Sequence, residues 1–208
     1  MLRTRSLTFS YDENTSFDFP DLQLESGEKM LLFGESGVGK TTFLHLIAGL
    51  LRPNTGSVEL KGTMISELPS LQLDRYRGEN IGLVFQSPHF VQAINVLENL
   101  SLVQYLAKKP QDKKRSIAVL QSLGVADKKF KKPNQLSQGE QQRVSIAMAV
   151  INSPQLILAD EPTASLDDKN CKRVVDLLKE QAEASNSQLI IITHDQRLKG
   201  EFQNTVTL

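Results

Sequence analysis

The sequence GESGVGKT at residues 34–41 fits the pattern G-x-x-x-x-G-K-[ST] of a phosphate-binding P-loop. An apolar run, residues 30–33, precedes it, and a helix-like run, residues 42–51, follows it. This strand, loop and helix are the context that such a loop requires, which a chance match would lack. The stretch therefore predicts a nucleoside triphosphate with Mg²⁺ as the ligand.

Each residue type in this loop has a physical reason. The three glycines can adopt backbone angles closed to other residues and let the main chain approach a phosphate. Backbone N–H groups then converge at a helix N-terminus, which carries partial positive charge. Lys40 adds a full charge for the β- and γ-phosphates, and the Thr41 hydroxyl is the expected Mg²⁺ ligand. The expected nucleotide contacts in this stretch are Gly34, Glu35, Ser36, Gly37, Val38, Gly39, Lys40, Thr41 and Thr42.

Composition limits the class of protein. The chain has 208 residues, 39% of them hydrophobic, so it can bury a real core. Its 24 basic and 24 acidic side chains balance, which argues against coating nucleic acid through bulk charge. No apolar run approaches the roughly 18 residues of a membrane span, and the N-terminus lacks a signal-peptide pattern. With Cys171 as the one cysteine, no intrachain disulfide can form, and we expect a cytoplasmic protein.

The overall balance conceals a basic segment. Residues 108–132 hold nine basic and two acidic side chains, an excess of seven that the rest of the chain offsets. One interpretation is a solvated helical face and loop, as charge runs usually are. The other is a surface near anionic lipid or an acidic partner.

Further apolar runs predict a buried parallel sheet. They are residues 81–85, 156–159 and 189–192. Because these runs are nearly continuous, they suit strands covered on both faces. Polar residues follow each run: Gln86, then Asp160 and Glu161, then His194. Since ligands of open α/β sheets bind outside the carboxyl ends of the strands, we expect these groups to converge at one edge with the P-loop.

The remaining chain predicts two additions to this core. Residues 7–11 and 17–19 alternate in the manner of antiparallel strands. Residues 96–152 offer three helix-like segments, at about 96–107, 112–123 and 137–151. We therefore expect one domain over residues 1–208, with an ATP-binding core (1–86 and 153–208) and a helical subdomain (87–152).

Two pairs of residues carry further chemistry. Asp160 is placed to hold Mg²⁺ and Glu161 to deprotonate an attacking water, although a lone Asp-Glu pair is often an exposed turn. Ser137 and Glu140 form an ordinary capping box at a helix start. Glycine at position 139, inside that first turn, lowers helix stability by about 1 kcal/mol relative to alanine. A capping box does not require this glycine, but the close approach of an anion to the backbone N–H groups does.

With these motifs in place, nearly the whole chain resembles the ATP-binding cassette ATPases of ABC transporters. The matching motifs, in family order, are Tyr11 (adenine stacking), Walker A (34–41), the Q-loop Gln86, the signature (136–140), Walker B (156–160) with catalytic Glu161, the D-loop (165–167) and the switch histidine His194. The resemblance implies a P-loop NTPase (RecA-like) core with a mainly parallel sheet, an N-terminal antiparallel β subdomain and an inserted α-helical subdomain. It implies Glu161, His194, Gln86 and Lys40 as catalytic residues.

The family also implies ligands and partners. ATP and Mg²⁺ bind with Thr41, Gln86 and Asp160 at the metal, and Ser137, Gly139 and Glu140 act on the nucleotide of a second subunit. A homodimer, a transmembrane permease and a position on the cytoplasmic face of the membrane are expected, without nucleic acid. In the signature motif, Gln138 replaces the first glycine of the usual sequence Leu-Ser-Gly-Gly. This replacement could alter the dimer contact.

The function within the family stays open at this stage. The short length of the chain and the sequences of residues 81–86 and 138–143 are similar to those of one group in the family. Members of that group serve lipoprotein release, macrolide or peptide export and cell-division signalling. An importer ATPase and a transmembrane signalling subunit are alternatives. A third class, soluble ATPases acting on DNA or ribosomes, usually has coiled coils or two cassettes, which this sequence lacks.

Overall fold

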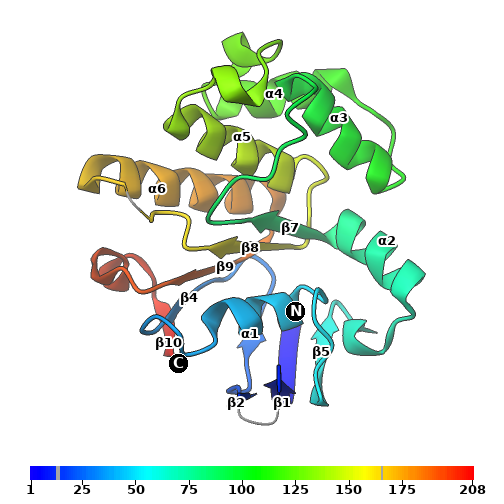
Figure 1. The fold of residues 1–208 in the computed structure, drawn as a ribbon, viewed down its shortest axis with the longest axis vertical. Helices are drawn as coiled ribbons and strands as arrows, with labels where there is room; N and C mark the ends of the chain where they lie inside the picture. The colour runs from blue at the N-terminus through cyan, green and yellow to red at the C-terminus, as the bar shows by residue number, and fades with distance from the viewer. Residues whose placement is uncertain (13–14, 165) are drawn as a thin grey trace.

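The computed structural model describes residues 1–12, 15–164 and 166–208, in three layers (Figure 1). The central layer is a five-stranded parallel sheet of order β10-β4-β9-β8-β7. Its strands are β4 (Lys29–Phe33), β7 (Ile81–Val84), β8 (Leu156–Asp160), β9 (Gln188–Thr193) and β10 (Asn204–Thr207). The predicted parallel sheet is therefore confirmed, with β10 added at its edge.

Both faces of this sheet are buried, as the continuous apolar runs predict. Along β4, Leu31 and Phe33 enter one hydrophobic core, and Met30 and Leu32 enter another. The same alternation holds along β8 and β9. Helix α1 (Lys40–Ile47) belongs to the second core, and α5 and α6 belong to the first. Because neighbouring residues face different cores, no position on these strands is left for a polar residue until the strand ends.

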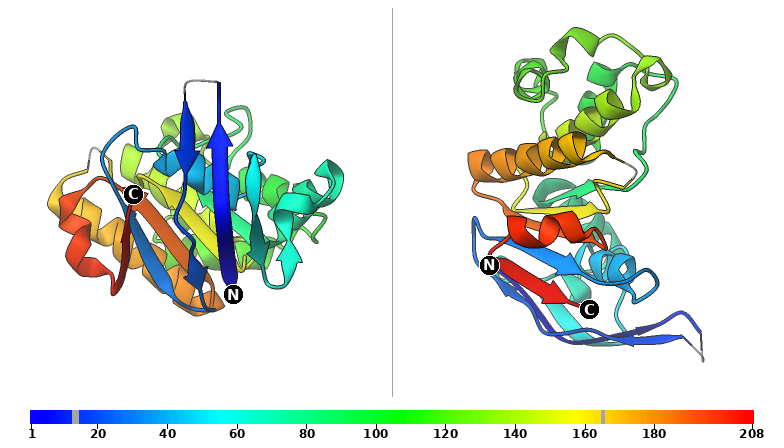
Figure 2. Two further views of the ribbon diagram at one scale, coloured as in Figure 1. Left: turned by 90° about the horizontal axis from the view of Figure 1, so that it is seen from below. Right: turned by 90° about the vertical axis from the view of Figure 1, so that its left-hand side faces the viewer.

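An antiparallel sheet forms the layer beyond α1 (Figure 2). It contains β1 (Leu2–Ser10), β2 (Ser16–Asp18), β3 (Gln23–Leu24), β5 (Thr55–Leu60) and β6 (Thr63–Met64). Strand β1 pairs with β2, β3 and β5, and β5 pairs with β6. The predicted alternating strands are confirmed, although β1 begins at Leu2 rather than Leu7.

The helical layer covers the other face of the parallel sheet. It comprises α3 (Val96–Leu106), α4 (Lys113–Ser122), α5 (Gln138–Val150) and α6 (Asp168–Ser185). Helices α3, α4 and α5 match the three segments expected between residues 96 and 152. Among the described residues, no helix has both the length and the apolar character that crossing a membrane requires.

Sequence reasoning missed α2 (Ser70–Asn80), which precedes β7. Leu73 is its one buried residue, so the helix lacks the apolar stripe from which helices are predicted. Short 3₁₀ turns complete the chain. These are η1 (Ile65–Glu67), η2 (Ala126–Lys128), η3 (Pro133–Gln135) and η4 (Gln196–Glu201).

Candidate nucleotide-binding site

The register of the parallel sheet brings the predicted polar groups to one edge. Phe33 at the end of β4 pairs with Thr193 at the end of β9, and Asp160 of β8 pairs with Ile192. The residues that follow these strands line a cavity of about 290 Å³. Its lining is Phe17, Ser36, Gly37, Gly39, Lys40, Thr41, Thr42, Gln86, Glu161 and His194. The expected convergence is confirmed.

The P-loop glycines serve the loop in two different ways. Gly37 and Gly39 have positive φ angles, 89° and 93°, which other residues adopt at a cost. A Cβ on Gly39 would also lie 2.7 Å from the ring of Phe17. Gly34 is not in this left-handed region, so the expectation of special backbone angles is wrong there. Space is its requirement, because a Cβ would lie 3.0 Å from Cγ2 of Val38.

Lys40 is held at the floor of the cavity. Its Nζ donates to the backbone oxygens of Gly34 at 2.9 Å and Glu35 at 2.6 Å. The same Nζ lies 3.8 Å from Oε1 of Glu161, and the Lys40 side chain is only 7% exposed. A buried ammonium group beside converging N–H donors is suited to an anionic ligand such as a polyphosphate.

Asp160 and Thr41 meet beside the lysine. The Thr41 hydroxyl donates to Oδ1 of Asp160 at 3.3 Å. Burial raises the pKa of Asp160, and the Thr41 hydrogen bond opposes that rise. Gln86 lines the same cavity. A carboxylate, a hydroxyl and an amide are the hard oxygen donors that Mg²⁺ prefers, and a cation would offset the cost of burying the carboxylate, so this donor set fits Mg²⁺.

Glu161 is the most constrained residue of the site. Its φ of 45° lies in the left-handed region, where a non-glycine residue is strained. Its carboxylate accepts hydrogen bonds from the Thr193 hydroxyl at 2.8 Å and the His194 backbone N–H at 3.2 Å. Nδ1 of His194 lies 2.8 Å from Oε1 of Glu161. The carboxylate is thus aimed into the cavity by contacts from β9.

The segment after β9 is tied to the start of α6 by a residue that sequence reasoning missed. Arg197 donates to Asp195 through Nε and Nη2, to Asp168 at 2.6 Å and to the backbone oxygen of Leu166. These bonds hold the pKa of the Asp195 carboxyl below its usual range. Cys171 is buried against this cluster, with its Sγ 3.8 Å from Oδ2 of Asp195. Of the predicted D-loop, Ser165 lies outside the described residues.

Aromatic residues form one rim of the cavity. Tyr11 is 58% exposed, and its hydroxyl lies 3.1 Å from Oγ1 of Thr42. Its ring packs edge-on against Phe9 and Phe17. An exposed ring beside the P-loop helix is available to stack on a base. Phe17, which lines the cavity, was not singled out from the sequence because its alternation with Phe19 indicates only a strand.

The signature residues lie apart from this cavity. Ser137 caps α5, and its capping box with Glu140 is present as predicted. Hydrogen bonding to the Ser137 backbone, aided by Lys128, lowers the pKa of Glu140 to about 2. None of Ser137, Gly139 and Glu140 lines the P-loop cavity; Gly139 instead borders a groove with Asp167.

Among the described residues, Gly139 has no steric reason to be glycine. A Cβ there would meet only Nη1 of Arg143, at 3.7 Å, an ordinary contact. Its φ angle is not in the left-handed region. A group from outside the chain that closely approaches the start of α5 would explain this glycine.

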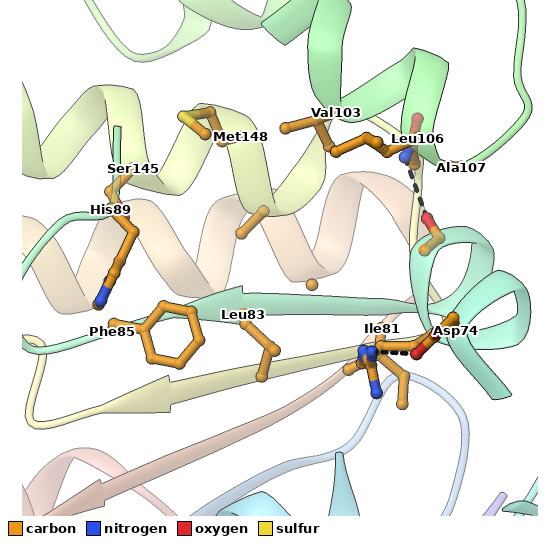
Figure 3. A pocket seen from close by; sticks show the side chains of 15 residues that line it. Asp74, Ile81, Leu83, Phe85, His89, Val103, Leu106, Ala107, Ser145 and Met148 are labelled. Carbon is orange, nitrogen blue, oxygen red and sulfur yellow. Dashed lines mark hydrogen bonds and ion pairs between the residues drawn. The ribbon is translucent and has the colours of Figure 1, made fainter. Parts of the chain in front are cut away.

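A larger hollow of about 430 Å³ lies between α2, β7, α3 and α5 (Figure 3). Figure 3 shows Phe85 and His89 at one end and Asp74 of α2 at the other. Asp74 forms an ion pair with Arg77 at 2.6 Å. Apolar side chains line its middle, including Leu83 and Met148. Two buried polar residues, Ser145 and Asn152, also line it, and no described residue donates to Oδ1 of Asn152.

Known proteins resemble the chain over almost its whole length. A family described as ABC transporter matches residues 18–164. The lipoprotein-releasing system ATP-binding protein LolD of Buchnera aphidicola is 38% identical over 193 residues, 92% of this chain and 82% of that protein. HrtA of Staphylococcus aureus, whose name refers to hemin import, is 42% identical over 180 residues, 86% of this chain and 81% of that protein. A dimeric post-hydrolysis structure of the ATP-binding cassette MJ0796, bound to ADP and Pi, has a TM-score of 0.88 at 30% identity, covering 100% of this chain and 94% of that one.

Proposed function

The chain belongs to the ABC transporter family as an ATP-hydrolysing subunit, and we propose that it works in a dimer that drives release of a lipid-anchored protein from a membrane. The relative LolD, named for lipoprotein release, supports this direction. HrtA, named for hemin import, makes an importer the main alternative. A signalling subunit that moves no substrate is the other alternative.

The proposed chemistry assigns a role to each group in the cavity. Lys40 and the loop N–H groups bind the β- and γ-phosphates. Thr41, Asp160 and Gln86 hold Mg²⁺, which neutralises phosphate charge when it is bound. Glu161 accepts a proton from the attacking water, because its carboxylate is already aimed into the cavity by its hydrogen bonds to Thr193 and His194. Before this step, His194 contacts the γ-phosphate of the bound nucleotide.

The separation of the signature from the P-loop carries the dimer proposal. One chain provides the loop, the metal ligands and Glu161 in one cavity, but its Ser137 and Gly139 lie elsewhere. A second copy, facing the first in reverse, would bring the start of its α5 onto the exposed phosphates. Each ATP is then enclosed by two helix N-termini from different chains.

The hollow in Figure 3 is the proposed contact with the permease. Its middle is lined by apolar side chains such as Leu83 and Met148, which suit an apolar helix face. Phe85 at its end lies next to Gln86 of the ATP site, so a permease helix seated in the hollow could sense the nucleotide. We place residues 85–94 at this contact, where the ATP-binding core (1–86 and 153–208) meets the helical subdomain (87–152).

Concentration dependence tests the paired site. ATP turnover per chain should fall on dilution, because two chains must meet to complete each site. Mixing Lys40→Ala with Gly139→Asp offers a sharper test, since each variant alone lacks one half of every site. Mixed dimers contain one site with both halves intact and should recover turnover. Turnover that is unchanged by dilution, or no recovery in mixed dimers, would contradict the proposal.

The direction of transport needs the membrane partner. The chain, purified with its native permease and reconstituted in vesicles, should release a lipid-anchored protein when ATP is added. Uptake of a small solute under the same conditions would favour the importer. ATP-dependent activation of a bound enzyme, without transport, would favour the signalling subunit.

A further inference from the structure

Residues 128–132, which read KKFKK, are the densest basic stretch of the chain. They join α4 to α5 in the helical layer, between η2 and η3. Phe130, at the centre of this stretch, is 71% exposed. Because the ring is exposed, it contributes far less to folding stability than a buried aromatic side chain would. A large apolar side chain among lysines therefore needs another reason.

The stretch is held firmly rather than being a loose loop. The backbone N–H groups of Val96 and Leu97, at the start of α3, donate to the oxygens of Lys131 at 3.0 Å and Lys129 at 2.9 Å. The N–H of Lys131 donates to the oxygen of Lys128 at 2.8 Å. The backbone thus satisfies the first N–H groups of α3, and its side chains are free to face outward from a fixed support.

Three other cations of the basic segment are already engaged. Lys128 pairs with Asp127 at 3.0 Å and Glu140 at 3.2 Å. Lys109 and Arg115 donate to the backbone oxygens of Asn152 and Ile151.

Within the described residues, by contrast, no carboxylate lies within ion-pair distance of Lys129, Lys131 or Lys132. Lys131 and Lys132 are exposed, and Nζ of Lys129 lies 5.1 Å from the ring centre of Phe130. Three ammonium groups next to one exposed ring in the sequence are therefore available to a partner.

We propose that residues 129–132, the KFKK patch, bind the surface of a bilayer that contains anionic phospholipid. Lysines suit such a surface because they are point charges, whereas a fixed carboxylate partner favours the planar fork of arginine. The ring of Phe130 suits the boundary between headgroups and acyl chains, where amphipathic surfaces bury aromatic residues. The attraction is local, since outside residues 108–132 the chain carries an acidic excess of seven. The inference rests on the proposed function only in placing the chain at a membrane.

Vesicle binding by the full chain tests this inference. We expect the protein to sediment with vesicles of phosphatidylglycerol and not with vesicles of phosphatidylcholine. Binding should weaken as salt shortens the screening length from about 10 Å at 0.1 M towards about 3 Å at 1 M. Each lysine near an anionic surface strengthens association roughly fivefold, so K131E/K132E should weaken it by roughly 25-fold or more. Phe130→Ser should weaken it as well, without a change in charge.

The chain offers a matched control in Lys113 and Lys114. They are adjacent, exposed lysines of the same basic segment, at the start of α4. K113E/K114E changes the net charge by the same amount, so it should retain affinity within about fivefold if the attraction is local. Both double variants should keep the far-ultraviolet circular dichroism and the basal ATP turnover of the unaltered chain.

Several results would overturn the inference. They are equal binding to both vesicle types, equal weakening by the two double variants, or no weakening by K131E/K132E. Binding only to vesicles that contain the permease, lost in K131E/K132E, would show that the patch docks on protein instead. Loss of transport with vesicle binding intact would count against the proposed function and leave the KFKK patch standing.

Discussion

Gly139→Ala should separate the stability of this chain from its activity. Within the part of the chain that the structure describes, the new methyl group meets only Nη1 of Arg143 at 3.7 Å, and the backbone of α5 is already helical there. Replacing glycine by alanine in a helix stabilises it by about 0.5–1 kcal/mol. For a chain of this size, that raises Tm by about 1–4 °C. The variant should therefore unfold later than the unaltered protein.

Turnover should change in the opposite direction. If phosphate from a second subunit approaches the start of α5, the methyl group occupies part of that approach. Loss of one hydrogen bond to a charged group costs about 1.5–3 kcal/mol, which is a roughly 10- to 100-fold drop in kcat/KM. Thermal unfolding and steady-state ATP hydrolysis measure the two effects on one preparation.

Gly200→Ala is the matched control for this experiment. Gly200 is exposed in η4, its φ angle is not left-handed, and a Cβ there meets nothing within 4 Å. It should gain similar stability through a less flexible unfolded chain and keep full turnover. The reasoning is refuted if Gly139→Ala hydrolyses ATP as fast as this control, or if it loses stability.

Three further substitutions test the site. Glu161→Gln should bind ATP, lose turnover by roughly 100-fold or more and accumulate as an ATP-bound dimer in size-exclusion chromatography; normal steady-state hydrolysis would remove Glu161 from its role. Burial raises the pKa of Asp160 in the folded chain. The free energy of unfolding therefore decreases as the pH rises through this pKa, because the buried carboxyl group then has to ionise. Asp160→Asn should thus increase the free energy of unfolding of the ligand-free chain at pH 7 while abolishing Mg²⁺-dependent turnover; urea titration that shows a loss of stability would disprove this. Because the folded protein lowers the pKa of Asp195, this residue stabilises the fold at pH values above its unfolded pKa of about 3.9. That stabilisation is lost as the pH falls through the pKa of the folded state. Arg197→Ala should therefore flatten the acid limb of stability between about pH 5 and pH 2, and an unchanged limb would show that the arginine does not tune Asp195.

The sequence predicted the sheet and the site edge well for a physical reason. A strand buried on both faces admits no polar residue along its length, so Asp160 and His194 mark strand ends directly. Parallel pairing then fixes which ends meet. The P-loop pattern marks the end of one more strand, β4, because a glycine-rich phosphate loop of this kind connects the end of a strand to the start of a helix.

What the sequence could not supply are contacts between groups far apart along the chain. Arg197 joins Leu166 and Asp168 to Asp195. The residues next to Arg197 in the sequence give no indication of these contacts. Phe17 reaches the P-loop only because β2 folds back on β1. Helix α2 was missed for the opposite reason: its polar residues carry no periodic signal, and tertiary contacts maintain it.

The hydrogen bonds of Glu161 also indicate which part of the site must move on the proposed mechanism. Oε1 of Glu161 already contacts both the backbone N–H and the imidazole of His194, so this oxygen can hold a water most readily if one of these partners leaves. Thr193 is completely buried at the end of β9, and the backbone N–H of His194 is fixed by the same strand. The His194 side chain is 60% exposed, against 12% for Glu161, and no other described side chain pairs with it. The imidazole is therefore the partner that can leave at least cost, and the γ-phosphate is the group that can receive it. Glu161 would then become free to act as a base only when a nucleotide has drawn His194 away, which ties hydrolysis to occupancy of the site.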